Sequence, residues 1–366
     1  MKKAVLMCMQ MRAIEVSPAR CQLIQEMKAN NIEVYLVLNG KLNVSARKIR
    51  GDIKHYLNSE NMSNKEIRNK IINYNPDMVI AFTYEDTEVI YALPMELKNT
   101  RFYYYNLEIN TRGYNLESYK KYTWKYFINL VKYPSTKSRE VFYTKKCELL
   151  VIQDEERKRI SHKYHISHRK TIMIPNSYVL EKNIELNVGR SGIVYSGGAR
   201  KKYLIDYLHN FKSITKVSVV FAGNFDEWSK EQIVRLHKTN PNIVMENQIL
   251  EMDEYTEYLQ KYAVGLICYS KSDDDNINHI GLSSGKFFKH LSIGQPVIVM
   301  GCPKISREVR RYNLGIVVQD ASQIDEAYQK IMDNYSYYCE NVVRTYQNKY
   351  DFHKIIKPFL ETLVMG

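Results

Sequence analysis

The sequence predicts an α/β protein with two Rossmann-like, doubly wound domains. Short apolar runs alternate with helical patterns along the chain, which is typical of parallel βαβ units. With 366 residues, 45% of them hydrophobic, the chain is long enough to bury two ordinary cores. Residues 178–190 have no periodic pattern, and a new glycine-flanked strand begins at Gly192. We therefore expect domains at 1–177 and 192–345, a linker at 178–191 and a C-terminal helical segment at 346–366.

Each expected strand is a short run of apolar, β-branched or aromatic residues, bounded by polar residues, glycine or proline. In chain order these runs are 3–9, 33–38, 77–82, 101–106, 149–153, 171–174, 192–196, 216–222, 243–246, 264–268, 296–299 and 315–318. Helical patterns lie between them at 17–30, 64–73, 119–133, 154–164, 202–211, 253–262 and 324–335. A last helix, 350–365, is expected to bend at Pro358, whose ring removes a backbone hydrogen bond.

The net charge of +13 favours a polyanionic partner. Residues 120–170 hold 14 Lys/Arg and 5 Asp/Glu, a balance of 14 − 5 = +9. In the helix 119–133 the side chains of Lys121, Lys125 and Lys132 fall beside an apolar stripe, as in helices that lie on an anionic membrane surface. A core-packing helix with a solvated lysine face explains the same pattern. No nucleic-acid reading module is present, so we expect no nucleic-acid partner.

No apolar run has the length of a membrane span, and the apolar run at the N-terminus is too short for a signal peptide. We therefore expect a cytoplasmic protein, peripheral at the inner face of the membrane. The six cysteines are dispersed, which predicts reduced thiols and no zinc site. The acidic loop Asp273-Asp274-Asp275-Asn276 has the residue types that chelate divalent ions. It lies in a polar loop, and we expect no bound metal.

The segment 281–299 is the most informative part of the sequence. Ser283 and Ser284 begin a short helix, Lys286 follows within its first turn, and a Gly-Gln-Pro turn leads into a buried strand. A helix start of this kind directs backbone N–H groups and an ammonium at an anion, so a phosphate site is predicted. Simple helix capping beside an exposed lysine is the alternative.

A second basic segment follows the strand 192–196. Gly197 and Gly198 allow the backbone to approach a ligand closely, and Arg200, Lys201 and Lys202 supply cations for a diphosphate. A solvated basic loop is the alternative for these cations.

Together, the order of elements, the Ile174-Pro175-Asn176-Ser177 junction, the strand followed by Gly197-Gly198 and the Ser-Ser-Gly-Lys…Gly-Gln-Pro segment resemble a GT-B glycosyltransferase of the retaining family 4 type, over about residues 3–360. The resemblance implies two domains facing a cleft, with a UDP- or GDP-linked sugar held by the C-terminal domain, an acceptor held by the N-terminal domain, and no cofactor or metal. Leu250 falls where such folds seat the nucleobase.

Site residues follow from the motifs and from this resemblance. Donor contacts are expected from Gly197, Gly198, Arg200, Lys201, Leu250, Ser283, Ser284, Lys286 and His290. Acceptor contacts are expected from Ser17, Arg20 and Glu85, near the carboxyl ends of strands. Glu108 is the candidate catalytic carboxylate, as a base or as an orienter of the reacting hydroxyl. A structural carboxylate beside Arg112 is the alternative for Glu108, a helix-packing role is the alternative for His290, and Arg20 faces either the cleft or solvent.

The chain also departs from the family. Two glutamates, eight positions apart in family 4, are replaced by Gly281 and Lys289, so the recognition of the donor ribose differs. The predicted function is transfer of a sugar from a nucleotide-sugar to a hydroxyl of a glycan or a polyprenyl-diphosphate-linked glycan, with retention of configuration. The missing glutamates motivate a second hypothesis, a non-catalytic GT-B-like partner subunit of a glycosyltransferase complex. A nucleotide-sugar epimerase on a similar frame is a third.

Overall fold

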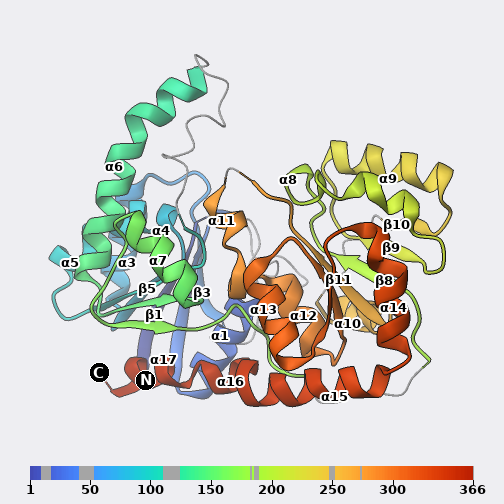
Figure 1. The fold of residues 1–366 in the computed structure, drawn as a ribbon. Helices are drawn as coiled ribbons and strands as arrows, with labels where there is room; N and C mark the ends of the chain where they lie inside the picture. Colours follow the sequence, from blue (N-terminus) through green and yellow to red (C-terminus); the bar gives the residue numbers. More distant parts are fainter. Residues whose placement is uncertain are drawn as a thin grey trace. The chain divides into compact units, whose positions relative to one another are not determined.

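The computed structural model describes residues 1–9, 18–40, 53–109, 124–181, 184, 189–246, 252–272 and 274–365. These form two compact units, which are described separately below (Figure 1). Unit 1 comprises 1–175 and 353–366, and unit 2 comprises 176–352. The C-terminal segment expected at 346–366 is thus divided between the two units.

Unit 1 contains a seven-stranded parallel sheet in the order β3-β2-β1-β4-β5-β6-β7. The strands are β1 Lys2–Cys8, β2 Ile32–Leu38, β3 Ile53–Asn58, β4 Met78–Ala81, β5 Arg101–Tyr105, β6 Leu149–Ile152 and β7 Thr171–Met173. Six of them confirm the sequence prediction. The edge strand β3 was not predicted, because its sequence IKHYLN mixes polar and apolar residues without alternation and lacks the continuous apolar run of a central strand.

Helices cover both faces of this sheet. They are α1 Pro18–Ala29, α3 Asn64–Tyr74, α4 Tyr84–Ile90, α5 Leu93–Glu96, α6 Trp124–Lys146, α7 Glu155–Lys163, α16 Phe352–Ile355 and α17 Lys357–Met365. The prediction that the basic helix ends at residue 133 is wrong, because α6 continues through Pro134. The carbonyl of Pro134 accepts a hydrogen bond from Ser138 Oγ at 2.8 Å. Figure 1 shows α6 projecting beyond the strands of unit 1.

The C-terminal helix α17 packs on the sheet of unit 1 (Figure 1). Phe359 lies edge-on to Tyr103 and Tyr105, with ring centroids 5.7 and 5.6 Å away. Arg101 donates hydrogen bonds to the carbonyls of Thr362 and Leu363, both at 2.8 Å, so a cation sits at the negative end of the helix. The predicted bend at Pro358 is wrong: α16 ends at Ile355, and Pro358 lies in the first turn of α17, where its missing N–H costs nothing.

Unit 2 contains a six-stranded parallel sheet in the order β10-β9-β8-β11-β12-β13. The strands are β8 Ile193–Ser196, β9 Val219–Ala222, β10 Ile243–Glu246, β11 Val264–Cys268, β12 Val297–Met300 and β13 Gly315–Val317. All six confirm the prediction. One face of the sheet is buried under α9 and α14 and the other under α10, α12 and α13, while the edge strands β10 and β13 are only partly buried.

The helical elements of unit 2 are α8 Lys201–Leu204, η3 Leu208–Ser213, α9 Glu227–Thr239, α10 Met252–Gln260, α11 Asp275–Asn278, η4 Gly281–Ser283, α12 Gly285–Ser292, α13 Pro303–Tyr312, η5 Ala321–Gln323, α14 Ile324–Met332, α15 Tyr335–Thr345 and the π-helical turn η6 Tyr346–Tyr350. A single helix over 202–211 was predicted wrongly. The N–H of Asp206 donates to Ser270 Oγ at 3.0 Å, and the carbonyl of Tyr203 accepts from the N–H of Ser270. These tertiary bonds divide the segment into α8 and η3.

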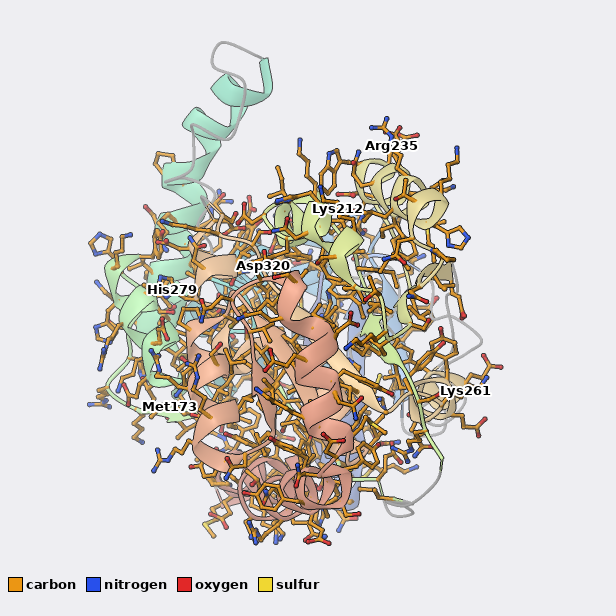
Figure 2. The ribbon with its side chains drawn as sticks, turned by 45° about the vertical axis from the view of Figure 1, so that its right-hand side comes forward. Met173, Lys212, Arg235, Lys261, His279 and Asp320 are labelled. Carbon is orange, nitrogen blue, oxygen red and sulfur yellow. The ribbon has the colours of Figure 1, made fainter. Side chains whose placement is uncertain are left out.

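The cationic side chains of unit 2 that Figure 2 labels, Lys212, Arg235 and Lys261, are exposed and point away from the core. Within the described residues, no helix combines the length and the apolar content that crossing a membrane demands.

Candidate functional site

The central strands β8 and β11 form the topological switch point of unit 2, because the chain leaves them toward opposite edges of the sheet. Open α/β sheets bind ligands at the carboxyl ends of such strands. Gly197 follows β8 with φ +85°, a conformation that favours glycine. Gly223, after β9, packs on it so closely that a Cβ there would lie 2.4 Å from Gly197 O. At this edge a Cβ on Gly197 would lie 3.4 Å from Lys286 Cε, so the glycine leaves room for the lysine side chain.

Helix α12 begins at this edge. Ser284 is its N-cap: its Oγ accepts from the N–H of Phe287 at 3.3 Å and shares a hydrogen bond with Tyr269 OH at 2.9 Å. The predicted hydroxyl-rich helix start is confirmed, and Ser284 is the capping residue. Ser283 lies one residue outside, in η4, and its Oγ donates to Ile280 O at 2.8 Å.

Lys286, in the first turn of α12, crosses to the carboxyl end of β8. Its Nζ donates to Gly198 O at 2.9 Å and to Tyr195 OH at 2.5 Å. The ammonium lies over three tyrosine rings, at 4.1 Å from the centroid of Tyr195, 5.1 Å from Tyr203 and 5.7 Å from Tyr269. Burial lowers the pKa of Lys286 to about 7, and the charge of Arg200 acts in the same direction. An anion beside Lys286 would raise this pKa and favour the charged ammonium.

Of the basic segment after β8, Arg200 belongs to this group. A Cβ on Gly198 would lie 3.8 Å from Arg200 Nε, so Arg200 and Lys286 both adjoin Gly198. Lys201 does not: its side chain is exposed and its Nζ lies 5.7 Å from the ring centroid of Trp228. The exposed Lys202 has its Nζ 5.4 Å from the ring centroid of Tyr203. The structure thus gathers two of the four predicted cations, Lys286 and Arg200, around one glycine. The tyrosine rings around Lys286 were not predicted, because they come from three separate segments.

His290 does not contact this surface, which corrects its predicted role as a donor ligand. The ring is fully buried, with Nε2 3.0 Å from Ser196 Oγ and Nδ1 2.5 Å from Gln295 Oε1. Burial lowers its pKa to about 4, so the ring is neutral at pH 7. It fills the space over Gly265, where a Cβ would lie 2.4 Å from the ring. His290 therefore packs α12 against β11.

Lys289 lies one turn after Lys286 in α12 and contacts the carboxylate of Glu181. Its Nζ donates to Thr256 Oγ1 at 2.6 Å and lies 3.6 Å from Glu181 Oε1. The backbone N–H of Glu181 donates to Ser292 O, which fixes this segment beside α12. A carboxylate therefore lies next to the helix although position 289 itself is basic. Sequence reasoning missed Glu181 because it is more than a hundred residues away along the chain.

Two predicted features lie wholly or partly outside the described residues: Leu250, and Asp273 of the acidic loop. The neighbouring Asp274 is the N-cap of α11, where its side chain accepts from the N–H of Asn276 at 2.9 Å. Across the part of the chain that the structure describes, no group of three or more His, Cys, Asp or Glu side chains is arranged to hold a metal ion.

In unit 1 the switch point lies between β1 and β4. Asp86 is fully buried there, and its carboxylate accepts from the N–H groups of Met9, Phe82 and Thr83 at 2.7, 2.8 and 2.9 Å. Burial raises its pKa to about 6, although Arg20 and the three amides act in the opposite direction. The Asp86 carboxylate thus links the carboxyl ends of β1 and β4 through hydrogen bonds.

The residues of unit 1 that were predicted to contact the acceptor lie in different surroundings. Ser17 lies outside the described residues. Arg20 is buried, with its guanidinium 4.9 Å from the ring centroid of Phe82, so it faces neither solvent nor an open surface. Glu85 is half-buried in the first turn of α4. Glu108 is exposed in the loop after β5, and its alternative partner Arg112 is not among the described residues.

No protein-family model matches the chain, and no curated protein matches it significantly in sequence. Solved structures do match over its whole length. HepE from Anabaena in complex with UDP-glucose superposes with a TM-score of 0.71 at 10% identity, covering 100% of both chains. Sucrose-phosphate synthase from Thermosynechococcus elongatus gives 0.68 at 12% identity, covering 99% of this chain and 98% of that one.

WaaG, a glycosyltransferase involved in lipopolysaccharide biosynthesis, gives a TM-score of 0.66 at 11% identity and covers 100% of both chains. The chain has the GT-B fold. The two parallel sheets, with helices on both faces, are the Rossmann-like domains of the GT-B fold. In unit 2 the Lys286 and Arg200 cluster occupies the carboxyl edge of such a domain.

Proposed function

We propose that the protein is a glycosyltransferase that moves a sugar from a UDP- or GDP-linked donor to a hydroxyl of a glycan or lipid-linked glycan. One observation carries the proposal: Lys286 and Arg200 adjoin Gly198 at the switch point of unit 2, beside the capped start of α12. This arrangement suits a diphosphate. HepE of the same fold was crystallised with UDP and with UDP-glucose.

In this reaction the bond between the anomeric carbon and the β-phosphate oxygen breaks, and the acceptor oxygen forms the new bond. The diphosphate leaves with additional negative charge, which Lys286, Arg200 and the N–H groups of α12 are placed to stabilise. Removing one such donor typically costs about 3–4 kcal/mol of transition-state stabilisation. With retention of configuration, the proton of the acceptor hydroxyl passes to the departing diphosphate oxygen, and the exposed Glu108 of unit 1 is the candidate that orients this hydroxyl.

For the donor ribose we propose Glu181 as the hydrogen-bond acceptor. Lys289 lies one turn from Lys286, and side chains at this spacing are neighbours on a helix. Lys289 holds the Glu181 carboxylate at 3.6 Å, and a carboxylate accepts hydrogen bonds from ribose hydroxyls. Glu181, on a different segment, would thereby take the place of the glutamate that the family carries at the position of Lys289.

The resemblance to family 4 supports retention of configuration and a reaction without metal. The basic stretch 120–170 and WaaG's part in lipopolysaccharide biosynthesis support an acceptor at a cytoplasmic, anionic membrane surface. Flotation with anionic and with neutral liposomes tests the membrane proposal, and equal binding to the two would contradict it.

A donor screen that detects free nucleoside diphosphate tests the central proposal, together with calorimetric titration of UDP and GDP. We expect Lys286→Ala to weaken the binding of both nucleotides strongly. Lys212→Ala is the matched control, because Lys212 is an exposed lysine of the same unit, at the end of η3 (Figure 2). The second hypothesis, a non-catalytic partner subunit, rests on the replacement of both family glutamates by Gly281 and Lys289. It predicts no binding of any nucleotide or nucleotide-sugar.

A further inference from the structure

A pocket with a basic lining lies at the amino edge of the sheet in unit 2. Its volume is about 290 Å³, toward the small end for ligand pockets. Helix α13 starts after the carboxyl end of β12 and runs back to the start of β13, so its last residues lie at the opposite edge of the sheet from Lys286. The end of α13 and the junction of α15 with η6 form the pocket. Its lining includes Arg311, Tyr312, Asn313, Arg344, Asn348 and Lys349.

Two of the three cations in this lining have no acidic partner. Lys349 Nζ lies 2.8 Å from the buried carboxylate of Glu308. Neither Arg311 nor Arg344 forms an ion pair with a carboxylate among the described residues, and Arg344 donates instead to the neutral side chain of Asn341. Cations that line one small pocket repel each other, and a bound anion would remove that repulsion.

The chemistry of the lining suits a phosphate. Lys349 Nζ donates to Tyr312 OH at 3.0 Å, which leaves the phenolic proton to be donated to a different acceptor. The exposed amides of Asn313 and Asn348 add further N–H donors. A guanidinium binds an oxyanion through two parallel hydrogen bonds. A phosphate has enough oxygens and charge for both guanidinium groups, whereas a carboxylate offers two oxygens and a single charge.

The pocket is built on an uncommon backbone turn that is anchored in the core. The turn η6 is π-helical, and such turns are rare and frequently lie at functional sites. Within it, the buried ring of Tyr350 packs on Phe288 of α12, with the ring centroids 5.1 Å apart. This contact holds the turn, and with it Asn348 and Lys349, beside the end of α13.

We propose that this pocket binds a phosphate group and is a second anion site of unit 2, distinct from the Lys286 and Arg200 cluster. Arg311 and Arg344 contact the phosphate oxygens, and Tyr312 donates to them from the floor between α13 and η6. A soluble phosphate compound and a phosphate-bearing lipid headgroup present the same oxyanion to these side chains. Binding here does not depend on glycosyl transfer, because the pocket lies at the other edge of the sheet.

The double variant Arg311→Gln with Arg344→Gln, made in the Lys286→Met protein, tests the proposal. Lys286→Met weakens the other cluster, so that the remaining phosphate binding reports on the pocket. Pyrophosphate is titrated by calorimetry at physiological ionic strength, where weak surface attraction is screened. In parallel, flotation is measured with phosphatidylcholine vesicles with and without phosphatidic acid. We expect the double variant to weaken phosphate binding about 100-fold, about tenfold for each charged donor removed.

Arg235→Gln with Arg310→Gln is the matched control. Both are exposed arginines of unit 2 outside the lining, so this pair removes the same charge (Figure 2 labels Arg235). It should leave phosphate binding unchanged. A loss specific to the pocket pair in the pyrophosphate titration supports the proposal with a soluble ligand, and one seen only in flotation supports it with a lipid headgroup.

The proposal is overturned if neither measurement separates the pocket pair from the control pair. Failure of the wild-type protein to bind UDP would instead contradict the proposed function.

Discussion

Donor binding should be coupled to proton uptake at Lys286. In the free protein, burial lowers the pKa of Lys286 to about 7, and the charge of Arg200 acts in the same direction. A diphosphate beside the ammonium would raise that pKa toward the ordinary lysine value of about 10.4. The protein therefore takes up a proton when the diphosphate arrives at a pH above 7.

The sign and size of the effect follow from linkage. Below pH 7, Lys286 is already charged before the nucleotide binds. Its ionisation therefore adds no pH dependence to the affinity. Above pH 7, the logarithm of Kd rises by up to one for each pH unit. Between pH 7 and 9 the affinity for UDP should fall by up to about 100-fold, or about 2.7 kcal/mol.

Isothermal titration of UDP at pH 6.5 to 9, in buffers of different ionisation enthalpy, measures both the affinity and the protons taken up. Lys286→Met, which keeps the unbranched apolar stem but lacks the amino group, should bind more weakly at pH 7 and show no proton uptake. The reasoning is refuted if the wild-type affinity is unchanged between pH 7 and 9, or if Lys286→Met shows the same slope.

Three other substitutions test the packing and the donor site. Although burial opposes ionisation, hydrogen bonds from Lys349, Tyr350 and Lys304 lower the pKa of Glu308 to about 2. Glu308→Gln should therefore cost up to about 3 kcal/mol at pH 7, and urea unfolding should show this difference shrinking as the pH falls from about 4.5 toward 2. Arg101→Ala removes two hydrogen bonds to the end of α17, and we expect a loss of roughly 1–3 kcal/mol with faster hydrogen exchange in that helix; unchanged exchange would contradict the capping role. Glu181→Gln should raise the KM for the nucleotide-sugar about tenfold and abolish discrimination against a 2′-deoxyribose donor, and an unchanged KM would exclude Glu181 from the ribose site.

Much of the fold follows from local patterns in the sequence. The central strands of both sheets are continuous apolar runs, because a parallel strand is buried on both faces, and each was predicted within a few residues. The edge strand β3 lacks that signal. The division of 202–211 into α8 and η3 depends on Ser270, and the start of α17 depends on a docking site for Phe359. Neither partner can be read from the local sequence.

The same distinction holds for the candidate site. The capped start of α12, the early Lys286 and the glycines after β8 can be predicted from the sequence, because each is a local motif of a few residues. The meeting of Lys286 and Arg200 at Gly198, the separate position of Lys201 and the burial of His290 over Gly265 depend on the tertiary structure. Electrostatic and packing interactions act through space, so the partners of a charge are set by which strand ends the fold brings together.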